Sequence, residues 1–112
     1  MIVFSKPTFR TPKGEEAVSH SHSFDAGCAW GAFALQALAM GYHTHGMSGF
    51  DTEGALITVG APAGCRAEAA IAVGRLGDKS ALPEHLQARE QPGGRAPLTK
   101  LAFEGVFPEA SD

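Results

Sequence analysis

Apolar residues recur at helical spacing along residues 23–40, and the repeating positions are Ala26, Trp30, Phe33, Ala37 and Met40. The opposite side carries Cys28, Leu35 and Ala39, so the predicted helix is apolar nearly all round and is expected to be buried on several sides. Ser23 is expected to cap its start and Gly41 to end it. A chain of 112 residues has little material to bury such a helix, which indicates a partner chain or a missing domain.

Two shorter apolar runs predict strands. Residues 1–5 are typical of a short strand with β-branched content, and residues 67–75 form a nearly continuous apolar run bounded by glycine. Because such a run is typical of a parallel strand with both faces covered, we expect residues 67–75 to be a buried parallel strand. The polar segments 6–22 and 42–49 are predicted to be loops.

Two further helical segments are short. Asp51 is a suitable N-cap for a helix over residues 52–59, and a helical turn is expected within residues 82–90. Residues 98–107 form an apolar tail that we expect to be extended and that has no obvious place in this chain. Together these elements predict a single α/β (α+β) domain over residues 1–112.

Composition narrows the function classes. A net charge of −3 and the lack of a basic stripe with interleaved aromatic residues argue against nucleic acid as a partner. The most apolar segment contains Asp25, Gln36 and two glycines, so it is too interrupted to predict a membrane span. The first six residues do not have the pattern of a signal peptide, so the cytoplasm is the expected compartment.

Two segments are candidates for ligand binding. A glycine-rich turn, His45-Gly46-Met47-Ser48-Gly49, leads through Phe50 into the helix predicted after Asp51, and its backbone N–H groups suit an anion or an electron-rich ring edge. Arg95 follows Gly93-Gly94, and an arginine on a glycine turn suits a phosphate. A plain loop-to-helix transition and a solvated surface arginine are the alternatives.

The histidines and cysteines allow two other chemistries. His20 with His22 and His43 with His45 form pairs that would bind zinc or copper if they met, with ordinary loop histidines as the alternative. Cys28 and Cys65 form no CxxC pair, and we expect two buried, reduced thiols rather than catalytic nucleophiles.

The order of these segments resembles the C-terminal half of the nitroreductase family, the FMN-dependent NAD(P)H oxidoreductases. The family pattern is a strand, a loop, a long apolar helix, a Gly-Phe-Asp turn, a further strand and an Arg-x-Pro-Leu segment. The matching segments are Ile2–Ser5, Ser23–Met40 with Phe24-Asp25-Ala26-Gly27, Gly49-Phe50-Asp51, Ile71–Leu76 and Arg95-Ala96-Pro97-Leu98. The resemblance covers nearly the whole chain and implies a partial nitroreductase-like fold.

The resemblance also implies a cofactor site. Gly46, Met47, Ser48 and Gly49 would lie along the FMN ring and donate backbone N–H groups to it, and Arg95 would hold the FMN phosphate. Some family members have a lysine two residues before this arginine, where this chain has Gly93. The implied reaction takes hydride from NAD(P)H through FMN to a nitroaromatic, quinone or enone.

The resemblance further implies an assembly. Family members are intertwined homodimers whose C-terminal tail joins the partner's sheet, a role that residues 98–107 would fill. The N-terminal half of the family, which supplies further phosphate and ring contacts, is not among these 112 residues. We therefore expect a homodimer or association with a missing N-terminal half. The alternative is a truncated, non-catalytic fragment that binds no flavin alone.

Overall fold

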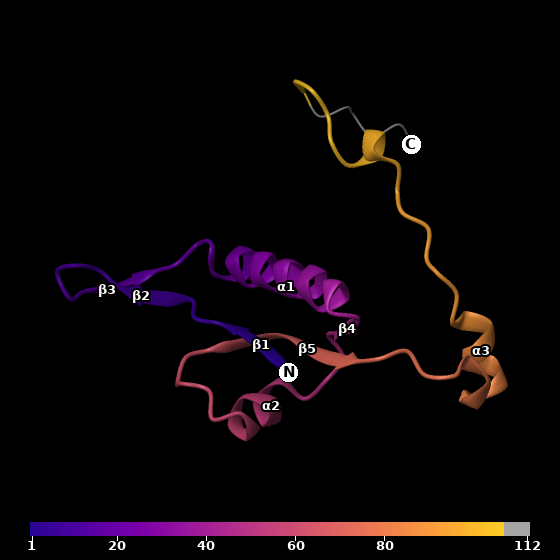
Figure 1. The fold of residues 1–112 in the computed structure, drawn as a ribbon. Coiled ribbons are helices and arrows are strands. Elements are labelled where there is room, and N and C mark those ends of the chain that lie inside the picture. The colour runs from indigo at the N-terminus through magenta and orange to yellow at the C-terminus, as the bar shows by residue number, and fades with distance from the viewer. Residues whose placement is uncertain (107–112) are drawn as a thin grey trace. The chain divides into compact units, whose positions relative to one another are not determined.

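The computed structural model describes residues 1–106, and the chain divides into two compact units, Met1–Leu76 and Gly77–Asp112 (Figure 1). The expectation of one nitroreductase-like domain over residues 1–112 stays a prediction. Among the described residues, no helix combines the length and hydropathy that are needed to cross a bilayer.

The first unit is built on a three-stranded sheet in the order β1-β5-β4, with β1 at Ile2–Ser5, β4 at His43–Met47 and β5 at Arg66–Gly74. Both pairings of β5 are antiparallel, so the prediction of a parallel strand over residues 67–75 was wrong. Helices α1 and α2 lie on opposite sides of the sheet (Figure 1). A strand covered on both faces is apolar at successive positions whatever its direction, which explains why the sequence pattern misled.

Two segments that were predicted as loops contain strands. Residues 42–49 include β4, whose polar sequence His43-Thr44-His45 carries no strand signal and which is ordered by pairing with β5. Residues 6–22 include a hairpin of β2 (Thr8–Arg10) and β3 (Glu16–Val18). Gly14 has a φ of 82° in its turn, a conformation that glycine adopts without steric cost.

Helix α1 (His22–Ala39) begins before Ser23, with Ser21 at its N-cap position. The Ser21 hydroxyl donates to the Asp25 carboxylate at 2.8 Å, and Gly41 follows the helix with a φ of 78°, as predicted for a C′ glycine. The helix packs on β1 and β4, where Ala26 and Ala37 are buried.

The other side of α1 is exposed within this chain, so the expected burial on several sides is not found. Phe24 and Leu35 are each 72% exposed and Leu38 is 58% exposed. Because the described part of the chain covers one side of α1 only, a large apolar area of the helix stays in contact with solvent.

Helix α2 (Thr52–Thr58) confirms the short helix predicted after Asp51. The Asp51 carboxylate accepts from the Gly54 backbone N–H at 3.0 Å, which is the expected N-cap bond. A side chain at position 54 would meet the Asp51 carboxylate in its present rotamer, so the carboxylate would have to move to accommodate it. α2 packs against β5.

The second unit contains short helical segments: η1 (Lys79–Ala81), α3 (Glu84–Arg89) and η2 (Leu98–Lys100). α3 confirms the helical turn predicted within residues 82–90. The tail was expected to be extended, but residues 98–100 form a turn of 3₁₀ helix in which Lys100 N–H donates to Pro97 at 2.9 Å. Phe107, the last residue of the predicted tail, lies outside the described residues.

Replacement of Asp51 by Ala is expected to lower the free energy of unfolding by about 1 kcal/mol, because it removes the N-cap acceptor of α2. Urea denaturation followed by circular dichroism measures this change. Asp51→Asn is the control, since an amide oxygen still accepts the bond. Equal denaturation midpoints for wild type and Asp51→Ala would contradict the assignment of the cap.

Candidate functional site

The segment predicted to bind a ligand lies at the end of an edge strand. Gly46 and Met47 are the last residues of β4, and Ser48 and Gly49 follow it in an exposed turn. The backbone N–H groups of Ser48 and Gly49 donate to no acceptor within residues 1–106. A side chain at position 49 would project into open space. Two successive unpaired amides beside open space can donate to the edge of a flat ligand.

Gly46 differs from Gly49 because its surroundings are filled. A Cβ atom at position 46 would lie 3.5 Å from Cζ2 of Trp30 and 3.7 Å from Cδ1 of Ile71. Trp30 comes from α1 and stacks with Phe33 at 6.2 Å between ring centroids, and Ile71 in β5 is only 2% exposed. The base of the candidate site is therefore packed against the core of the first unit.

Arg95 belongs to the second unit and is exposed. Its guanidinium takes part in no ion pair with the described residues, so it is available for a ligand. Four of the five predicted site residues, Gly46, Met47, Ser48 and Gly49, are neighbours in the sequence and lie in the first unit, whereas Arg95 lies in the second, so the predicted site stays a prediction.

A polar cluster that the sequence analysis missed joins β1, α1 and β5. The hydroxyls of Ser5 and Ser23 donate to Oε1 of Glu68 at 2.6 and 2.7 Å. Ser5 Oγ also lies 2.8 Å from Nδ1 of His22, and Arg66 Nε lies 3.5 Å from Oε2 of Glu68. The signal that could have revealed this cluster is Glu68 itself, a carboxylate inside an otherwise apolar strand.

The pKa of Glu68 is held below its usual value of 4.5 by the hydrogen bond from Ser5 and then by that from Ser23. Partial burial opposes this shift, while Arg66 and His22 add smaller contributions in the same direction as the serines. The cluster therefore stabilises Glu68 in its charged form, and at neutral pH Glu68 accepts hydrogen bonds as a carboxylate.

The cluster is not arranged as a nucleophilic triad. The single Ser5 proton is committed to Glu68, so the contact with His22 requires a proton on Nδ1. Glu68 lies 3.7 Å from the same nitrogen. In a catalytic triad the hydroxyl and the carboxylate meet opposite ring nitrogens, so this cluster is a structural tie between three elements.

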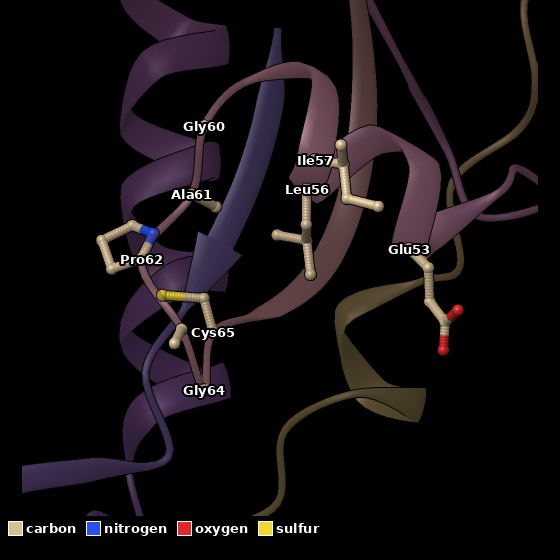
Figure 2. Close-up of a pocket in the computed structure, with 9 residues that line it drawn as sticks. Glu53, Leu56, Ile57, Gly60, Ala61, Pro62, Gly64 and Cys65 are labelled. Carbon is tan, nitrogen blue, oxygen red and sulfur yellow. The ribbon is translucent and has the colours of Figure 1, made fainter.

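A cavity of about 470 Å³ opens beside α2 (Figure 2). It is lined mainly by small and apolar residues, with Glu53 at one side and Cys65 at the other. Cys65 is half-buried and Cys28 is exposed, and both are free thiols, so the expected burial of Cys28 was wrong. Within residues 1–106, no three His, Cys, Asp or Glu side chains come together as metal ligands, and the histidine pairs receive no support as a metal site.

Comparison with known proteins finds similar chains. The structure matches that of an oxidoreductase containing FMN with a TM-score of 0.88 and 44% sequence identity, over 96% of this chain and 54% of that protein. The sequence is 34% identical over 92 residues to the uncharacterized 15.4 kDa protein in the ask 5′ region of Mycolicibacterium smegmatis, which covers 81% of this chain and 62% of that protein. No family model matches. This chain therefore spans less than two thirds of each of these two relatives.

Replacement of Glu68 by Gln is expected to destabilise the protein at about pH 7 and to have little effect at acidic pH. A carboxylate with a depressed pKa stabilises the fold above its unfolded value of 4.5, and this stabilisation is lost as pH falls through the lower folded value. Urea denaturation between about pH 3 and pH 7 measures the difference. Glu15→Gln, at an exposed carboxylate in the β2–β3 turn, is the control. A difference that does not change with pH would contradict the assignment.

Proposed function

We propose that this chain is part of an FMN-dependent oxidoreductase of nitroreductase type. The observation that carries the proposal is the 44% identity to an FMN-containing oxidoreductase across 96% of this chain. Identity at this level supports a shared fold and a shared flavin chemistry, and the residues of the site remain part of the proposal. The proposed compartment is the cytoplasm.

The residues of the candidate site suit a flavin. Ser48 and Gly49 offer unpaired amides beside open space, and backbone donors stabilise negative charge that develops on a ring edge. Arg95 offers a guanidinium for the FMN phosphate. Bound FMN would supply the redox chemistry, in which NAD(P)H gives up a hydride and a nitroaromatic, quinone or enone takes two electrons with protons from the donor and solvent.

The exposed side of α1 is the proposed assembly surface. Exposed residues lie one above the other along this side of the helix, one or two turns apart: Phe24, Cys28, Leu35 and Leu38. Gly31 lies in the same row and would allow a second helix to approach closely. The proposed partner is a second copy of this chain or a polypeptide that supplies the missing N-terminal half, and the apolar tail from Leu98 onward would contribute to the same assembly.

A second candidate is a non-catalytic fragment that associates through α1 but holds no flavin alone. The observation in its favour is Gly93, which stands where some nitroreductases have a lysine and so removes one phosphate contact. The two candidates differ in one measurable property, the binding of FMN by the purified chain.

Purified protein that is incubated with FMN and desalted is expected to keep flavin absorbance. Arg95→Ala is expected to weaken FMN affinity by about tenfold, as loss of a charged hydrogen-bonding partner of the phosphate would. Arg89→Ala, an arginine in α3 of the same unit, is the control and is expected to bind FMN as the wild type does. A colourless wild-type protein would favour the non-catalytic fragment, and steady-state NAD(P)H oxidation would follow a positive result.

Leu35→Glu is expected to convert associated protein to monomer, because a charge in the middle of the α1 row would have to be desolvated at the interface. Light scattering after size-exclusion chromatography measures the mass. Ile57→Glu, an 81% exposed apolar position on α2, is the control. Wild-type protein that is monomeric at all concentrations would overturn self-association through α1.

A further inference from the structure

The indole of Trp30 supports the strand that leads into the proposed flavin-binding turn. Gly46 lies beneath it, and a Cβ atom at that position would be 3.5 Å from Cζ2 and 3.7 Å from Cε2 of the ring. We infer that Trp30 is a positioning residue, which sets the place of Gly46 and through it the direction of the Ser48 and Gly49 amides. This inference rests on the proposed function.

The space between Gly46 and the indole is limited. A methyl group at position 46 would still meet the ring at an ordinary contact distance, but a larger side chain would displace it. Ile71, the cross-strand partner of Gly46 in β5, lies on the same face, where its Cδ1 would be 3.7 Å from the same Cβ atom, and it is 2% exposed. One face of β4 at Gly46 is therefore packed against the indole and the Ile71 side chain.

This support matters because β4 is an edge strand. Within the described residues β4 pairs only with β5, so its other edge has no hydrogen-bonded neighbour in the sheet. Strand residues rise about 3.3 Å each, which places Ser48 and Gly49 within roughly 7–10 Å of the contact along the chain. A shift of Gly46 would therefore be passed along the chain to the two amides, and hydrogen bonds weaken when their donors move out of distance or alignment.

The chain contains a single tryptophan, so its fluorescence reports this site alone. FMN titration of the wild type is expected to quench Trp30 emission in a saturable manner, with the same dissociation constant as the flavin absorbance change. Trp30→Ala is expected to weaken FMN binding about tenfold and to make the midpoint potential of the bound flavin more negative. Trp30→Phe, which keeps a flat ring over Gly46, is expected to restore both values to within about threefold of the wild-type affinity.

Two further variants make the test decisive. Gly46→Val pushes a branched side chain into the indole and is expected to reproduce the effect of Trp30→Ala. If circular dichroism shows that Trp30→Ala does not fold, Gly46→Val tests the positioning role in its place. Val18→Ala, at a 63% exposed apolar position of β3 outside the assembly surface, is expected to bind FMN as the wild type does.

The outcomes separate this inference from the proposed function. Wild-type affinity and potential in folded Trp30→Ala and Gly46→Val would overturn the positioning role and leave the flavin site intact. A wild-type protein that binds no FMN and shows no quenching would overturn both. Loss of affinity and a shifted potential in these two variants, with Trp30→Phe near the wild type, would establish Trp30 as the residue that positions the turn.

Discussion

Strand β5 is hydrogen-bonded along both edges, and the other strands of the three-stranded sheet take their positions from it. At its middle Ile71 is 2% exposed, its N–H donates to the Met1 carbonyl at 2.7 Å, and its carbonyl accepts from the Met1 ammonium at 2.9 Å. Both helices pack onto the sheet that this strand organises. The turn formed by Ser48 and Gly49 follows β4, so its position depends on the pairing of β4 with β5 and on the side chain of Ile71. The same holds for the proposed ligand site.

Helix α1 is held to that sheet at two places of different chemistry. Near its start, His22 and Ser23 join the polar cluster around Glu68, which reaches back to Ser5 of β1. Two turns later, the Trp30 indole lies over Gly46 of β4, 3.5 Å from where a Cβ atom would stand. A polar tie fixes the rotation of the helix because hydrogen bonds are directional, whereas the apolar contact fixes its distance from the sheet. As a result, the exposed row from Phe24 to Leu38 faces away from the sheet.

Local signals in the sequence predicted the elements that depend on local interactions. The helical repeat from Ala26 to Ala37, the Asp51 cap and the Gly41 terminus all follow from short-range spacing, and all three are present. β4 and the direction of β5 were missed because pairing with a distant strand creates them. The contact between Trp30 and Gly46 and the convergence of Ser5, His22 and Glu68 depend on the same long-range pairing. The four residues Gly46–Gly49 could be proposed from a family resemblance, whereas their support from α1 could not.

The pairing of Ile2 with Ala70 has a consequence for how the protein is made. The hairpin of β2 and β3 and the helix α1 consist of local contacts, so they can form while the chain is still leaving the ribosome. The first strand must wait, because its neighbour in the sheet is synthesised near the end of the first unit. During that interval the apolar edge of β1 and both sides of α1 are uncovered in the nascent chain. Completion of the sheet therefore has to await residues 66–74, and β1 is open to pairing with other chains until they are made.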